Sequence, residues 1–193
     1  IRFREASVGG LPSLRWWGTA DILNVISIDQ WGTNKWQELP RFCRDATNVE
    51  LLTTDIPDLS VCLNINAWFQ DAPLVSVDAS NYIFTDNTNI INLWVNTSFN
   101  SEITLPNTTS YVNVFSGSLM NSMIYGDTSL GTSFDGTLRN TPYDMPILLD
   151  VSSATTMSNF LNGGGISSAN YNTTLAYWRT LSLQNGVPLD MGT

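Results

Sequence analysis

The chain has 193 residues, of which 42% are hydrophobic and 11% aromatic, so it holds enough apolar material for one domain with its own core. The net charge is −9 and Lys35 is the only lysine. Binding to nucleic acids or anionic membranes through a broad basic face is therefore excluded. The absence of histidine also excludes Ser-His-Asp and Cys-His catalysis within the chain and zinc bound by histidine.

The polar residues are mainly hydroxyls and amides, since Ser, Thr and Asn make up about a third of the chain and charged residues only 13%. No repeat with a fixed period and no change in composition marks a domain boundary. The longest apolar runs fall far short of the ~20 residues that a membrane span needs. We therefore expect one domain over residues 1–193, with a C-terminal third that forms an irregular or projecting extension.

Alternation of apolar and polar residues predicts β-strands along the chain. In residues 62–69, Asn64 and Asn66 would face one side of a strand, and Leu63, Ile65 and Ala67 the other. The same reasoning predicts further strands over residues 90–95, 111–115, 147–151 and 174–183.

Turn signals separate these segments, and helix signals are few. Residues 154–161 would form two helical turns after a cap at Ser152 or Ser153. Many short strands with few helices are typical of a sandwich. The predicted fold is all-β: an antiparallel β-sandwich of jelly-roll type, with long loops and at most one or two short helices.

Cys43 and Cys62 are the only cysteines, which is too few for a four-thiolate metal site. Two interpretations stay open at this point. They are two buried free thiols, which behave as small hydrophobic side chains, or they form one disulfide.

Asp127, Thr128 and Ser129, followed by Gly131, resemble the Asp-Thr-Ser/Gly signature of aspartic proteases, which pairs two carboxylates about 3 Å apart. A second carboxylate would have to come from a symmetry-related copy, and an ordinary turn is the simpler interpretation. Residues 86–89 (Asp-Asn-Thr-Asn) offer oxygen ligands for calcium, but they lack the glycine and glutamate of an EF-hand and fit an Asx-turn better.

Seven tryptophans are present, and each would serve either in a core or interface or in a sugar-binding platform. The adjacent pair Trp16 and Trp17 is hard to bury within one chain, because neighbours in an extended segment point to opposite sides. Three N-glycosylation patterns begin at Asn96, Asn107 and Asn172, and they matter only in a secreted chain.

The stretch that starts at Leu59 and ends at Leu74 (LSVCLNINAWFQDAPL) resembles a strand segment in the jelly-roll capsid proteins of picorna-like viruses. In that family an alternating strand runs into a small-aromatic pair, followed by an acidic and an apolar residue. The resemblance implies a structural coat protein of a small non-enveloped icosahedral virus, located in the virion. About 120 residues follow this segment here, which differs from the usual position of the segment near the end of the jelly roll.

Our prediction is a non-enzymatic capsid subunit without a catalytic, cofactor or metal site. Its partners would be identical or sister subunits, which meet at weakly charged surfaces, together with a host receptor or glycan. Interfaces near Trp16 or Trp17 and exposed loops at residues 116–118 and 163–165 would make these contacts, and Arg2, Arg4 and Arg15 would touch neighbouring subunits. The alternative is a secreted or cell-surface carbohydrate-binding β-sandwich.

The excess of 17 acidic over 8 basic residues suggests crowded carboxylates at subunit interfaces. Crowding of like charges raises carboxyl pKa values. We therefore expect assembly to strengthen as the pH falls.

Overall fold

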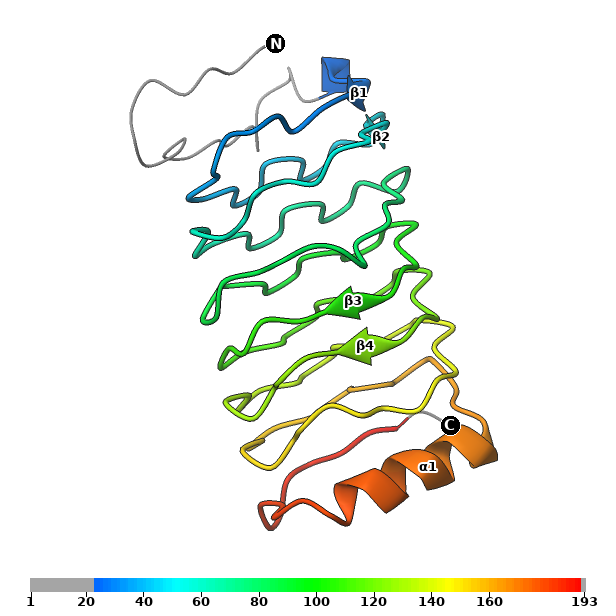
Figure 1. The fold of residues 1–193 in the computed structure, drawn as a ribbon. Helices are drawn as coiled ribbons and strands as arrows, with labels where there is room; N and C mark the ends of the chain where they lie inside the picture. Colours follow the sequence, from blue (N-terminus) through cyan, green and yellow to red (C-terminus); the bar gives the residue numbers. More distant parts are fainter. Residues whose placement is uncertain (1–22, 192–193) are drawn as a thin grey trace.

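The chain is a solenoid, in which successive coils of backbone stack on one another. The structure, a computed structural model, describes residues 23–191. Figure 1 shows the coils as a ladder that ends at a single C-terminal helix, α1 (Ser168–Trp178). Each coil contacts mainly the coil before it and the coil after it, as in other repeat proteins.

The backbone pairings of the described residues are parallel. β1 (Ser27–Ile28) pairs with β2 (Glu50–Leu51), β3 (Ile103–Thr104) pairs with β4 (Ile124–Tyr125), and the isolated bridges between coils are parallel as well. Of the described residues, only 8% are helical and 11% are in β structure. The fold is thus β-rich, but the antiparallel pairing predicted for a jelly-roll sandwich is wrong, because each coil returns the chain to the same side in the same direction.

Two columns of residues with positive φ define the repeat. In every one of six coils, two such residues lie four positions apart, and corresponding members of neighbouring coils are 21 to 26 residues apart. The first column consists of Arg41, Ala67, Asn92, Asn113, Gly136 and Asn159, and the second of Asp45, Asp71, Asn96, Gly117, Asn140 and Gly163.

These columns place a tight corner at the same point of each coil. Asn, Asp and Gly adopt the left-handed conformation at least cost, which explains why they fill most of the positions. The backbone N–H of one corner donates to a carbonyl of the next, as in Arg41 to Asn66, Ala67 to Ile91 and Asn92 to Val112. The repeat therefore exists, although its spacing varies.

The segments predicted as strands at residues 62–69, 90–95 and 111–115 are these corners. Ile65 and Ala67 are buried as expected, but Leu63 is 57% exposed. The predicted strands are wrong because one left-handed residue within each segment, and a second just after it, turn the chain before a period of two can continue.

The core is one continuous cluster of buried hydrophobic side chains along the stack, and it contains several groups of contacting aromatic rings. Trp94 stacks on Phe99, with ring centroids 4.1 Å apart, and Tyr111 stacks on Phe134 at 4.8 Å. Such contacts add to the burial of apolar area. The five described tryptophans all belong to this core and are at most 4% exposed: Trp31, Trp36, Trp68, Trp94 and Trp178.

Helix α1 covers the last coil. The strand predicted over residues 174–183 is wrong, because the first part of this range belongs to α1. Thr174 and Trp178 are buried, whereas Ala176 between them is exposed. A strand would have placed all three on one face, but a helix places only residues four apart together. The Trp178 indole N–H donates to the carbonyl of Leu149 (3.2 Å), and the Ile147 N–H donates to the Thr174 hydroxyl (2.9 Å).

The helix predicted at residues 154–161 is also wrong. These residues form the corner of the last coil, where Thr156 and Met157 make parallel bridges to Ser133 and Leu189. Burial of Met157, Phe160 and Leu161 in the stack outweighs the local helix signal.

A column of side-chain carbonyl groups fixes the start of α1. Asn100 Oδ1 accepts from the Asn121 N–H, Asn121 Oδ1 accepts from the Asp144 N–H, and Asp144 Oδ1 accepts from the Ser167 N–H, over 2.7 to 2.8 Å. Each side chain thus binds the backbone of the next coil. The last of these bonds holds the residue that precedes α1.

Candidate binding groove

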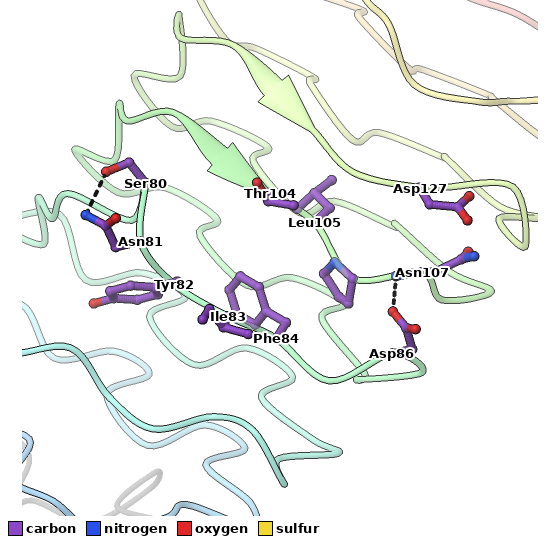
Figure 2. Close-up of a pocket in the computed structure, with 11 residues that line it drawn as sticks. Ser80, Asn81, Tyr82, Ile83, Phe84, Asp86, Thr104, Leu105, Asn107 and Asp127 are labelled. Atoms are coloured by element: carbon purple, nitrogen blue, oxygen red, sulfur yellow. Dashed lines mark hydrogen bonds between the residues drawn. The ribbon is translucent and has the colours of Figure 1, made fainter.

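A groove of about 450 Å³ lies between two neighbouring coils, on the outer side of the stack. One wall is formed by residues 80–86 and the other by residues 104–107, with Asp127 at one end. Figure 2 shows Ser80 and Asn81 near one end, and Asp86, Asn107 and Asp127 near the other, with the apolar side chains of Ile83, Phe84 and Leu105 between them.

The groove forms because two coils separate locally. The Ala79 N–H donates to Ser101 Oγ (3.0 Å) on one side of the gap, and the Asn87 N–H donates to the Asn107 carbonyl (2.8 Å) on the other. Between these points, no hydrogen bond in the described structure joins residues 80–85 to residues 102–106.

The gap leaves one edge of β3 unpaired. The N–H groups of Ile103 and Leu105 donate to carbonyls of the following coil, at Met123 (3.3 Å) and Tyr125 (2.8 Å). In a parallel pair the residue between them directs its N–H and C=O to the opposite side, so those of Thr104 face the groove. Within residues 23–191 these two groups have no hydrogen-bond partner.

Side chains along this side alternate between the core and solvent. Tyr82, Ile103, Ile124 and Ile147 are buried at corresponding points of four successive coils. The residues that follow them point outward and form the outer stripe: Ile83 (74% exposed), Thr104, Tyr125 (45%) and Leu148 (40%). Three of the four are large and apolar, so the outer stripe is an exposed hydrophobic surface.

The acidic end of the groove is held in place by hydrogen bonds. Asp86 Oδ1 accepts from the Asn107 N–H (3.1 Å), and Asn107 Nδ2 donates to Ser129 Oγ (3.4 Å). The Ser129 N–H in turn donates to Asp127 Oδ1 (3.0 Å), and hydrogen bonds from Ser129 lower the pKa of Asp127. Asp127 is therefore a carboxylate near neutral pH.

The motifs singled out in the sequence become turns. Asp127, Thr128 and Ser129 form an Asx-turn, in which Thr128 is buried and donates to the Asp150 carbonyl (2.9 Å). In the motif at residues 86–89, Asn87 has a positive φ (63°), as a tight turn requires. Among residues 23–191, no three His, Cys, Asp or Glu side chains gather as metal ligands would.

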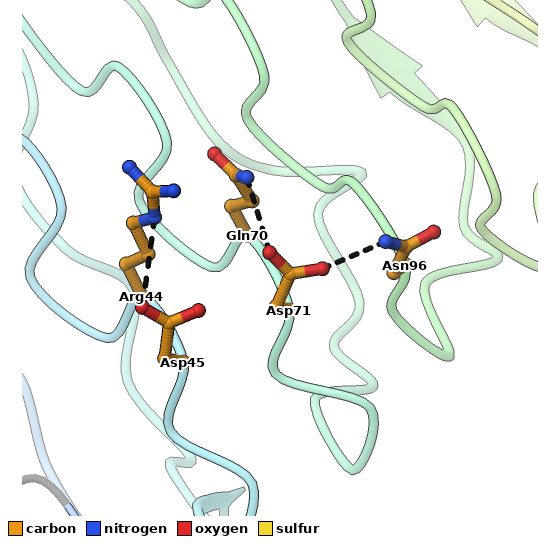
Figure 3. Close-up of polar contacts among 5 residues, drawn as sticks. All are labelled: Arg44, Asp45, Gln70, Asp71 and Asn96. Carbon is orange, nitrogen blue, oxygen red and sulfur yellow. Dashed lines mark hydrogen bonds and ion pairs between the residues drawn. The ribbon is translucent and has the colours of Figure 1, made fainter.

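A second polar feature lies along the second column of positive-φ residues, at Asp45, Asp71 and Asn96. Figure 3 shows Asp71 between Gln70 and Asn96, which donate to its two carboxylate oxygens over 3.1 and 2.7 Å. Arg44 lies 3.7 Å from the Asp45 carboxylate of its own coil. These contacts are satisfied within the stack, and surface pairs of this kind contribute little stability.

Several carboxyl groups of the single chain have a lowered pKa, whereas the composition led us to expect raised carboxyl pKa values at subunit interfaces. Asp58, Asp78, Asp127 and Asp144 all have a lowered pKa, chiefly because serine hydroxyls and N–H groups donate to the carboxylates. For the first three, the donor is the serine two residues later. Within one chain, local hydrogen bonds thus outweigh repulsion between like charges.

Both cysteines are buried free thiols, so the first of the two interpretations is confirmed for this structure. Burial raises the pKa of Cys62 to about 11 and raises that of Cys43 as well. Both cysteines therefore act as small, unreactive hydrophobic side chains in the core.

The predicted contact residues are placed as follows. The prediction of an exposed loop at residues 116–118 is wrong, because Ser116 and Ser118 are buried. In the predicted loop at residues 163–165, Gly163 and Gly165 are exposed. Asn172 is exposed on α1. The predicted contact residues near the N-terminus lie outside the described residues. They are Trp16, Trp17, Arg2, Arg4 and Arg15.

The geometry defines the class of the molecule as a solenoid protein of parallel coils. Comparison with known protein families, with curated proteins and with solved structures found no match to the chain. In the described residues, no helix has the length and hydropathy needed to cross a membrane.

Sequence reasoning missed the groove and the outer stripe. The available signal was the recurrence of a short apolar pattern before each Asp or Asn turn, as in residues 103–107, 124–127 and 147–150. Its alternation is visible locally, but the lateral alignment of these segments depends on coil lengths that vary.

Proposed function

We propose that the chain is a structural protein that assembles with further copies of itself through the outer stripe. The observation that carries this proposal is the outward position of Ile83, Tyr125 and Leu148 at corresponding points of the stack. Exposed apolar residues that recur along one side of a solenoid favour lateral contact with another protein surface.

The composition supports a second copy as the partner. The chain has only 13% charged residues, so its surface is polar mainly through neutral groups, which cost less to desolvate than charged groups do. Two copies with a net charge of −9 each repel one another, and the range of this repulsion shortens as the ionic strength rises. We therefore expect association to be stronger at high ionic strength than at low.

The capsid role is a more specific form of this function and stays a prediction. It would use the same kind of weakly charged, apolar contact surface between subunits. It was drawn from a resemblance to jelly-roll proteins, and the stacked parallel coils do not supply that fold. The carbohydrate-binding alternative has no support from the described tryptophans, because their rings lie in the core.

Sedimentation velocity over a wide range of protein concentrations tests the proposal. We expect species larger than the monomer, and a shift towards monomer in a Tyr125→Asp/Leu148→Asp double variant. The matched control is Leu74→Asp/Leu183→Asp, which adds the same charges at side chains of 49% and 47% exposure away from the outer stripe.

A stable monomer of the unmodified chain at all concentrations and salt conditions would overturn the proposal. Equal loss of association in the double variant and in its control would also count against it, because the effect would then come from charge alone. Far-UV circular dichroism of each variant establishes that the fold is retained.

A further inference from the structure

We propose that the groove beside β3 binds an extended peptide segment that carries apolar side chains and one basic residue. This site differs from the surface proposed above for self-association, although Ile83 and Thr104 belong to both. Three independent features support it: an unpaired backbone edge, an apolar lining and an acidic end.

The backbone edge gives the binding mode. The N–H and C=O of Thr104 face the groove without a partner, whereas the other edge of β3 is bonded to β4. An extended peptide alongside Thr104 would supply both a carbonyl and an N–H, and so continue the ladder that residues 80–85 interrupt. Proteins commonly bind peptides by adding a strand to an open edge of this kind.

The lining gives the preference for apolar side chains. Ile83, Phe84, Leu105 and Pro106 line the middle of the groove, and Ile83 is 74% exposed in the free chain. Leu105 and Pro106 are already buried, so a peptide would cover mainly Ile83 and the half-buried Phe84, and removal of their apolar surface from water favours binding. The volume of about 450 Å³ lies within the usual range for ligand sites.

The acidic end gives the preference for a basic residue. Asp86 and Asp127 line the groove at the same end, and no Lys or Arg lines it. The lowered pKa of Asp127 keeps this group charged at neutral pH. A lysine or arginine near this end of the peptide would form charge-assisted hydrogen bonds with the carboxylates.

A random linear heptapeptide library displayed on phage tests the proposal with the full chain as bait. We expect enrichment of peptides with a basic residue next to alternating apolar residues. Fluorescence anisotropy with the enriched peptide would show affinity at least tenfold weaker for Ile83→Asp. Ile26→Asp is the matched control, since Ile26 is 71% exposed and lies in the first described coil.

Two further changes separate the parts of the argument. Methylation of the peptide backbone nitrogen nearest Thr104, identified by amide shifts in NMR spectra, should weaken binding by about tenfold or more. A double Asp86→Asn/Asp127→Asn variant should lose the preference for basic over neutral peptides while it still binds the apolar residues.

The proposal is overturned if the library yields no enriched sequence, or if the enriched peptides bind Ile83→Asp and Ile26→Asp equally. Binding that responds to Tyr125→Asp/Leu148→Asp but not to Ile83→Asp would also overturn it, because the peptide would then occupy the surface proposed for self-association. That result would leave the proposed function intact.

Discussion

The Asp144 carboxylate accepts a 2.7 Å hydrogen bond from the backbone N–H of Ser167, the residue immediately before α1. The Asn170 amide donates to both the backbone carbonyl (2.8 Å) and a carboxylate oxygen (3.1 Å) of Asp144. The preceding coil thereby supplies the cap that the Ser167 side chain does not provide. The start of the helix is therefore held by one carboxylate outside it, while Thr174 and Trp178 hold the rest of the helix to the last coil.

We predict that α1 loosens in acid. Hydrogen bonds from Ser167 and Asn170 lower the pKa of Asp144, so its stabilising effect is complete above the unfolded value near ~3.9 and is lost as the pH falls below it. Asp144→Asn keeps an oxygen acceptor without the charge and should show a smaller loss of stability between about pH 5 and pH 3. Urea unfolding followed by far-UV circular dichroism measures this difference, and identical pH profiles for both proteins would contradict it.

Gly126→Ala should destabilise the fold strongly. Gly126 has φ +125°, and an added Cβ would lie 2.4 Å from the backbone carbonyl oxygen of Leu105, which cannot move without breaking the stack. We expect a loss of about 3 kcal/mol, from backbone strain plus overpacking. Thermal or urea unfolding measures it.

Gly186→Ala is the control for this change. Gly186 also has positive φ (+74°), but no atom lies within 4 Å of its added Cβ. The conformational cost alone is about 1 kcal/mol. Equal losses in the two variants would show that contact between coils at Leu105 is unimportant.

Ala67→Gly should leave stability unchanged or raise it by about 0.5 kcal/mol, because release of the left-handed strain outweighs the loss of one buried methyl group. Ala67 has φ +54° and is 1% exposed. Ala72→Gly, at an equally buried alanine without positive φ, should lower the free energy of unfolding by about 1 kcal/mol. The same loss in both variants would refute the strain at Ala67.

Both thiols should be unreactive in the native protein. Cys43 and Cys62 are fully buried, and burial raises the pKa of both, so almost no thiolate is available near neutral pH. A thiol reagent such as DTNB should label both cysteines only after denaturant is added. Rapid labelling of either one in the native chain would contradict the packing of the first two corners.

The buried apolar residues of each corner were predictable from sequence, but the corners themselves were not. Ile65, Ile90 and Tyr111 are buried as an alternating pattern suggests. The turn signal in the same segments is weak, because the first left-handed column includes Arg41 and Ala67, which are not typical of that conformation. Coil lengths of 21 to 26 residues further conceal the repeat from any search for a fixed period.

The groove lay beyond sequence reasoning for a different reason. It depends on the separation of residues 80–85 from residues 102–106, which are about 20 positions apart in the sequence and lie on neighbouring coils. The roles of Asp127 and Ser129 as a turn were predictable, because an Asx-turn is a local structure. Their position at the end of a groove is set by contacts more than 20 residues away.

Helix α1 also determines where the stack can grow. A parallel coil presents free N–H and C=O groups to whatever follows it, and an open edge of this kind invites unlimited end-to-end addition. Because the backbone of α1 is bonded internally, it offers no template beyond Ile147 and Leu149 on that side. The helix therefore closes one side of this end of the stack, whereas residues 188–190 continue the parallel pairing on the corner side, where Met157 and Leu161 donate to the carbonyls of Pro188 and Asp190.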